Sequence, residues 1–182
     1  MDPLPFDELN KLKAGLSAFV DEQGKLTRRD DLLDMLEDLF LLAYASGVET
    51  ANVALNGDYR APIDAVMRTV DAEVAGETWR DRVREYYDNG GTIDDIARIA
   101  GTESHRDANA GAVDAAQAAG AKYKTWITMQ DDRVRDTHEY LEAMTVPMGE
   151  DFYTYDGDHA PAPGQFALPQ NNINCRCFLI FS

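Results

Sequence analysis

The spacing of apolar residues changes once along this chain, at Gly120. Before it, apolar side chains recur every three or four residues, which is typical of amphipathic helices, and residues 5–21 predict the first of them. After it, residues 122–129 are rich in β-branched and aromatic side chains and predict a strand, and residues 175–181 predict a final strand. We therefore expect a mainly α fold with a small α+β subdomain at its C-terminal end.

Turn-forming residues divide the helical part. The strongest break is the Asn-Gly-Gly sequence at residues 89–91, and Thr92 behind it is a candidate N-cap. The alanine-rich segment from about Ile93 to Ala119 predicts one long helix. We therefore divide the chain into a helical N-terminal region, residues 1–90, and a region of residues 91–182 that contains the long helix and the α+β cap.

The charge balance argues against a nucleic-acid-binding module. The chain has 17 basic and 33 acidic residues, a formal net charge of −16. Because binding to a phosphate backbone needs clustered lysine and arginine, direct DNA binding is not expected. The longest apolar run, residues 39–45, is far shorter than the roughly 20 residues that span a bilayer, and no signal peptide is visible. We expect a protein made in the cytoplasm, without a membrane segment.

Reactive side chains gather in the last third of the chain. Both cysteines, Cys175 and Cys177, lie there with His138, and this sulfur, sulfur and nitrogen set suits a structural zinc ion. Asp131 or His159 would be the fourth ligand. A disulfide between residues i and i+2 is strained and rare, so we expect the cysteines to be reduced or to bind metal.

Two other interpretations of the same residues stay open. In one, the cysteines are small buried residues of the last strand, Asp131 caps a short helix over residues 131–144, and His138 is hydrogen-bonded in a small core. In the other, a cysteine–histidine pair is a nucleophile, or Asp131 and His138 hold a hydrolytic metal. The chain has no glycine-rich nucleophile turn, so we expect no catalytic residues and no enzyme activity.

Four short segments occur in a distinctive order over about residues 92–180. They are Ile96 to Arg106, which contains Thr102-Glu103; Lys124-Thr125-Trp126; Asp131 to His138; and Ile173-Asn174-Cys175-Arg176-Cys177. In order and spacing the chain resembles the phage Mu F-like head morphogenesis family, also called minor head or minor capsid proteins of tailed phages. Through this resemblance Glu103, Trp126, Arg133, Arg135 and Asn174 are structural motif positions.

Two positions depart from the family pattern. Gly101 stands where the family usually has an arginine before Thr-Glu, and Arg98, one turn earlier, is the candidate to replace it. Ala143 stands where a glycine commonly follows the histidine helix, so we expect a different turn there.

The resemblance implies a structural component of a bacteriophage virion, in the capsid interior or at the portal vertex. It implies a role in head morphogenesis and capsid assembly, and in DNA packaging or ejection, with the portal protein or capsid proteins as partners. Two alternatives belong to other classes of protein: a small metal-dependent hydrolase or nuclease, and a head–tail connector protein.

Overall fold

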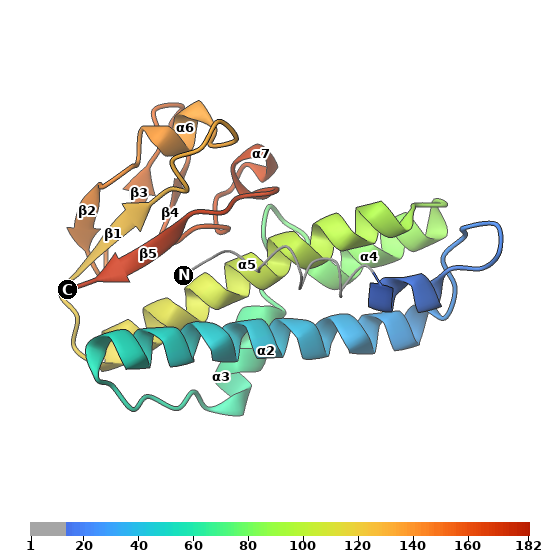
Figure 1. Ribbon diagram of the computed structural model, residues 1–182, viewed down its shortest axis with the longest axis horizontal. Helices are drawn as coiled ribbons and strands as arrows, with labels where there is room; N and C mark the ends of the chain where they lie inside the picture. The colour runs from blue at the N-terminus through green and yellow to red at the C-terminus, as the bar shows by residue number, and fades with distance from the viewer. Residues whose placement is uncertain (1–13) are drawn as a thin grey trace.

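Two long helices, α2 (Arg29–Leu55) and α5 (Ile93–Ala118), run side by side in the same direction and form the body of the protein (Figure 1). The computed structural model describes residues 14–182, so the first helix predicted from the sequence, over residues 5–21, lies largely outside the described residues. The remaining elements are η1 (Ser17–Phe19), α3 (Ile63–Val70), α4 (Trp79–Asp88), β1 (Tyr123–Ile127), α6 (Asp136–Glu139), β2 (Thr145–Pro147), β3 (Phe152–Tyr153), β4 (His159–Ala160), α7 (Pro169–Asn172) and β5 (Phe178–Phe181).

The long helix α5 begins where the sequence predicts it. The hydroxyl of Thr92 accepts a hydrogen bond from the amide of Asp95 at 3.3 Å, and the Asp95 carboxylate accepts one from the amide of Thr92 at 3.0 Å. This reciprocal capping box satisfies two amides that the first helical turn leaves without partners. The predicted N-cap is therefore confirmed.

The C-terminal cap is a three-stranded antiparallel sheet in the order β2-β1-β5, with the small β3–β4 hairpin beside it. Trp126 pairs with Leu179 and Thr125 with Thr145, so β1 is the central strand. The mainly α fold with a small α+β subdomain is confirmed. The last strand is shorter than predicted, because only residues 178–181 pair with β1 and both cysteines precede them.

Two separate hydrophobic cores fill the molecule. The helical core runs from Leu16 to Ala115 and includes Phe40 and Trp79, whose rings meet edge to face at 5.0 Å. The core of the cap is built around Trp126. Because α5 packs against α2 within the helical core, the predicted division at residues 90 and 91 does not coincide with the division between the two cores.

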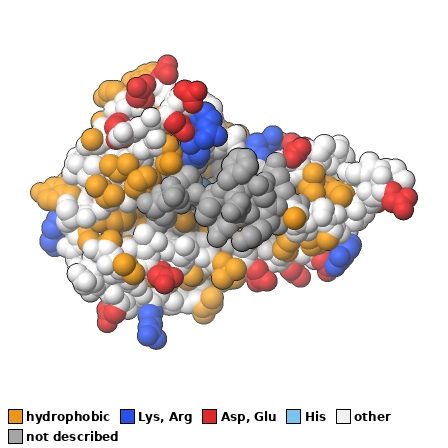
Figure 2. Space-filling view, in the orientation of Figure 1, with side chains coloured by type: hydrophobic (Ala, Val, Ile, Leu, Met, Phe, Trp, Pro, Cys, Tyr) orange, Lys and Arg blue, Asp and Glu red, His pale blue; other side chains and the backbone are white. Residues whose placement is uncertain are grey.

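Charged side chains are spread over the surface. Figure 2 shows acidic and basic groups scattered over the described part of this face, with no continuous basic area there. Within residues 14–182, no helix combines the length and the low polarity that a bilayer span requires.

Candidate functional site

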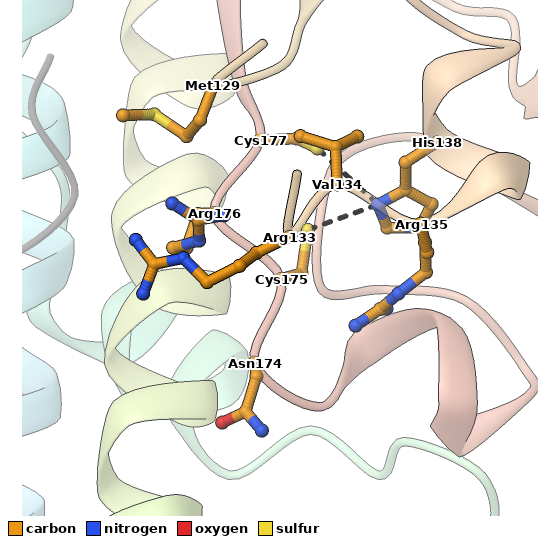
Figure 3. A pocket seen from close by; sticks show the side chains of 9 residues that line it. All are labelled: Met129, Arg133, Val134, Arg135, His138, Asn174, Cys175, Arg176 and Cys177. Atoms are coloured by element: carbon orange, nitrogen blue, oxygen red, sulfur yellow. Dashed lines mark hydrogen bonds between the residues drawn. The ribbon is translucent and has the colours of Figure 1, made fainter. Parts of the chain in front are cut away.

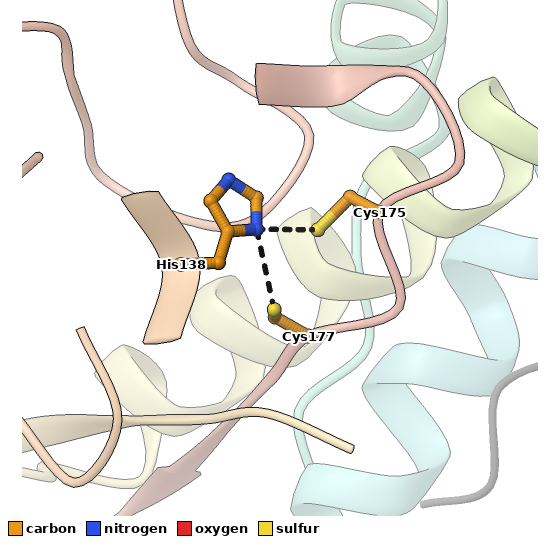
Figure 4. A group of neighbouring side chains, drawn as sticks. All are labelled: His138, Cys175 and Cys177. Atoms are coloured by element: carbon orange, nitrogen blue, oxygen red, sulfur yellow. Dashed lines mark hydrogen bonds between the residues drawn. The ribbon is translucent and has the colours of Figure 1, made fainter. Parts of the chain in front are cut away.

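The segment before β5 carries both cysteines past helix α6 and its histidine (Figure 3). His138 is 1% exposed, and its Nδ1 lies 3.6 Å from Sγ of Cys175 and 3.4 Å from Sγ of Cys177 (Figure 4). The two sulfurs and a ring nitrogen all lie within 4.8 Å of one another. The structure thus brings together three of the residues that the sequence marks as candidate ligands, and we call them the Cys2His cluster.

The backbone around Asn174 places the two cysteines. Asn174 has a left-handed φ of 56°, and the amide of the next residue donates a 3.0 Å hydrogen bond to the carbonyl of Asn172. Arg135, at the start of α6, donates a 2.6 Å hydrogen bond from Nη2 to the carbonyl of Ile173. The predicted motif positions Arg135 and Asn174 therefore hold the cysteine segment in place against α6.

Aromatic rings enclose the histidine. The ring of His138 meets Trp126 edge to face at 5.4 Å and lies 5.5 Å from the ring of Phe166. Trp126 and Phe166 are fully buried. The Nε2 atom of His138 points away from the sulfurs (Figure 4) and has no hydrogen-bond partner among the described residues. The imidazole is therefore fixed by packing and presents only Nδ1 to the cysteines.

Asp131 lies outside the Cys2His cluster, which corrects its prediction as the fourth ligand. Its carboxylate accepts hydrogen bonds of 2.7 and 2.6 Å from the guanidinium of Arg176, and a 3.1 Å bond from the amide of Arg133. The hydrogen bonds from Arg176 hold the pKa of Asp131 far below its usual range. His159 is also elsewhere: its side chain is exposed on β4, and its Nδ1 lies 2.7 Å from a carboxylate oxygen of Asp151.

The helix predicted for residues 131–144 is wrong in length, because α6 covers only residues 136–139. The Asp131 side chain bonds the amide two residues ahead, and its carbonyl accepts from the amide of Val134, so the chain turns there before the helix begins. Ala143, with a φ of 59°, ends the following turns. This is the position where the family commonly has glycine, which takes positive φ without strain.

A cavity of about 10 Å³ adjoins the Cys2His cluster. Its walls include Arg133, Arg135 and Arg176 (Figure 3), and none of the described residues that line it carries a carboxylate. The volume is about that of one enclosed water molecule.

The two thiols have different acidities. A hydrogen bond from the Cys177 thiol lowers the pKa of Cys175, and the nearby charges of Arg135 and Arg176 act in the same direction. The same bond, together with burial, raises the pKa of Cys177. Cys175 is therefore the first of the two to become a thiolate.

Sequence reasoning missed the burial of Lys124. This side chain is 1% exposed, donates a 2.7 Å hydrogen bond from Nζ to the carbonyl of Pro161, and lies 5.5 Å from the ring centre of Phe152. Burial lowers its pKa. The signal was present in the sequence: residues i and i+2 of a strand face the same side, so Lys124 had to share the inner face with Trp126.

A second polar cluster lies inside the helical core around Glu103. Its carboxylate accepts a 2.6 Å hydrogen bond from Arg82 and lies 2.7 Å from a guanidinium nitrogen of Arg106. Arg106 also bonds the carbonyl of Val70 at 2.8 Å, which fastens the end of α3 to α5. The two arginines thus surround the motif glutamate and were not identified from the sequence.

Arg98, the candidate to replace the family arginine at Gly101, does not bond Glu103. Its guanidinium bonds Asp95 at 3.0 Å and the hydroxyl of Tyr86 at 2.9 Å. Arg98 lies five residues before Glu103, so the two side chains leave α5 on different faces. The carboxylate of Glu103 pairs with Arg82 and Arg106 instead.

Asp107 gives the polar cluster a pH dependence. Burial raises its pKa from 3.8 to about 7, although Arg106 donates a 2.9 Å hydrogen bond to it. Between about pH 4 and pH 7 the folded chain keeps a proton that the unfolded chain has released, so the contribution of this group to the free energy of unfolding falls as pH rises. At 1.36 kcal/mol per pKa unit, the loss is about 4 kcal/mol at most.

We expect Asp107→Asn to remove this component of the pH dependence. Urea unfolding at pH 5 and pH 8 should show a larger fall in stability for the unaltered chain than for the variant. Asp132→Asn, at an exposed position, is the control, and its free energy of unfolding should fall between pH 5 and pH 8 as much as that of the unaltered chain. An equal change in the free energy of unfolding between pH 5 and pH 8 for the unaltered chain and for Asp107→Asn would contradict the prediction.

The chain thus has a body of long helices closed by a small cap. One core holds the motif glutamate Glu103, and in the other two cysteines meet His138. Residues 64–180 match the family described as Phage Mu protein F like protein. The chain therefore belongs to this family, as the motifs indicated.

Two curated proteins are similar to parts of the chain. Minor head protein GP7 of Bacillus phage SPP1 is 35% identical over 83 residues, which is 44% of this chain and 27% of that protein. NAD(+)--arginine ADP-ribosyltransferase EFV of Enterococcus faecalis is 35% identical over 57 residues, 31% of this chain and 12% of that protein. The chain thus spans about a quarter or less of each relative. No solved structure matches it.

Proposed function

We propose that this chain is a structural minor head protein of a tailed phage or prophage that acts in head morphogenesis. The observation that carries the proposal is the family match over residues 64–180, which includes the Glu103 cluster and the whole Cys2His cluster. The similarity to a protein named as a minor head protein supports it.

The architecture supports a structural role rather than catalysis. The motif residues close two cores: Glu103 and Arg106 join helices, and Trp126 lies at the centre of the cap. A hydrolase or nuclease needs a general base near its metal, and no carboxylate of the described residues lines the cavity beside the Cys2His cluster. The likeness to an ADP-ribosyltransferase covers 12% of that enzyme and gives no ground for carrying its activity over.

We further propose that the partner is the portal protein and that the chain lies at the portal vertex or inside the capsid. The net charge of −16 supports contact with protein rather than a coat around DNA. A role in DNA packaging or ejection would then act through the portal. A head–tail connector is the alternative, and it differs in which protein it binds.

The expected result is co-purification with the portal. The chain, co-expressed in turn with the portal, major capsid and tail-connector proteins of its own phage, should form a stable complex with the portal alone. Mass spectrometry of purified virions should detect it in filled heads. Its absence from virions would overturn the proposal, and a complex only with the connector would favour the alternative.

A further inference from the structure

The Cys2His cluster has the dimensions of a tetrahedral metal site. With metal–sulfur and metal–nitrogen distances of about 2.3 and 2.0–2.1 Å, the edge between sulfur and nitrogen of a zinc tetrahedron is about 3.6 Å. The distances from Nδ1 of His138 to the two sulfurs are 3.6 and 3.4 Å. Both sulfur–nitrogen distances thus match the edge of a zinc tetrahedron to within about 0.2 Å, and all three donor atoms lie within 4.8 Å of one another.

Hydrogen bonding alone does not explain why both sulfurs lie so close to Nδ1 of His138. A neutral imidazole nitrogen has one lone pair or one proton, so Nδ1 can bond one of the two thiols at a time. Both sulfurs nevertheless face the same nitrogen in a site where Cys175 and Cys177 are buried (Figure 4). A metal ion would bind all three atoms at once.

The protein holds the three donors before any ion arrives. His138 is fixed between Trp126 and Phe166, and the cysteine segment is fastened to α6 by Arg135. On the other side, the side-chain amide of Asn109 in α5 donates a 3.4 Å hydrogen bond to the carbonyl of Cys177. Donors that are already ordered lose little conformational freedom on binding, which favours affinity.

The charge and space around the cluster suit a divalent ion with one solvent ligand. Two thiolates and a neutral imidazole cancel the charge of Zn²⁺, which lowers the cost of burying it. The adjoining cavity of about 10 Å³ has room for a water molecule at the fourth position. Asp131 pairs with both Arg133 and Arg176, so Arg135, which bonds a backbone carbonyl, is the arginine of this wall whose charge faces the thiolates.

We propose that His138, Cys175 and Cys177 form a zinc site whose fourth ligand is a water molecule in the adjoining cavity. The ion links α6 to the last segment of the chain and locks the cap closed. Catalytic zinc sites also have a water ligand, but here, within the described part of the chain, no carboxylate lines the cavity to act on that water as a general base. Nδ1 binds the metal and the ring proton lies on Nε2, which faces aromatic rings and no hydrogen-bond acceptor among the described residues. A hydrogen-bond acceptor for the second ring nitrogen of a ligating histidine usually strengthens metal affinity about 10- to 100-fold. We therefore expect this site to bind zinc less tightly than sites in which the histidine has such an acceptor.

Cobalt substitution tests the site directly. The full chain, freed of metal with a chelator and titrated with Co²⁺, should take up equimolar metal and develop the thiolate charge-transfer and d–d absorption bands of a tetrahedral centre. Zn²⁺ should displace the cobalt and abolish the bands. Cys175→Ser and Cys177→Ser should lose them, whereas His159→Ala, which alters an exposed histidine away from the cluster, should keep them. Absent bands, or equal zinc uptake by the serine variants, would overturn the proposal.

Thiol protection in the unaltered chain gives a second measurement that needs no folded variant. At free zinc of about ten times Kd, alkylation of both cysteines should slow about tenfold, because only the metal-free fraction reacts. Excess chelator should restore the faster rate. Alkylation at the same rate with and without zinc would overturn the proposal while leaving the portal interaction unaffected.

Discussion

Trp126→Ala is expected to destabilise the C-terminal cap by about 3–5 kcal/mol, the usual cost of deleting a buried aromatic side chain. The indole is fully buried, and its ring centre lies 5.1 Å from that of Phe152 and 5.7 Å from that of Phe166. It also supports the imidazole of His138 edge to face. Removing it leaves a cavity among three buried rings, and the lost contacts with them add to the lost burial of the indole.

Chemical denaturation followed by circular dichroism measures this cost. Tyr153→Ala is the matched control, because it removes an aromatic side chain that is 59% exposed from the same cap and should change stability little. The helical core does not contain Trp126, so loss of amide-exchange protection in β1 and β5 with retained helix content would show that the cap opens on its own. A melting temperature unchanged by Trp126→Ala would contradict its central place.

The parts of the fold that sequence predicts well are those that local spacing controls. The boundaries of α5 follow from Thr92 and from the glycine after the helix, because caps act within a few residues. The inner face of β1 is also set by the alternation around Trp126, although the burial of Lys124 on that face was missed. Local signals of this kind do not depend on where the rest of the chain goes.

The contacts between distant segments could not be read in the same way. A carboxylate such as that of Asp131 is a chemically suitable metal ligand. It pairs instead with Arg176, 45 residues later, and this pairing depends on where the final segment crosses the cap. Likewise, Arg82 reaches Glu103 only because α4 lies against α5. The Cys2His cluster was predictable because thiol and imidazole side chains are rare in this chain, so few combinations existed.

Two glycines set the distance between the long helices, and sequence spacing gave no sign of them. A β-carbon at Gly111 of α5 would overlap the carbonyl oxygen of Tyr44 and lie 3.1 Å from its carbonyl carbon. At Gly47 of α2 it would overlap the carbonyl oxygen of Ala108 and lie 2.7 Å from its carbonyl carbon. These obstacles are helix backbone, which cannot rotate away as a side chain can, so relief requires α2 and α5 to separate.

Gly111→Ala is therefore expected to cost about 3 kcal/mol or more, at or above the upper end of the usual range for overpacking. Separation of the helices would also weaken the 2.5 Å hydrogen bond from the Tyr44 hydroxyl to Asp114. Gly101→Ala is the matched control in the same helix, because a β-carbon there meets nothing within 4 Å. This control should stabilise the chain by about 1 kcal/mol, the difference in helix propensity between glycine and alanine.

The double variant Gly47→Ala/Gly111→Ala tests whether one separation relieves both overlaps. Urea unfolding of the two single variants and the double should show a combined cost well below the sum, because helices already moved apart by the first methyl group accommodate the second. Additive losses of stability would mean that the overlap at each position is relieved by its own local shift. If Gly111→Ala were as stable as Gly101→Ala, α2 and α5 would accommodate a methyl group at this contact, which would contradict the close backbone packing at Tyr44.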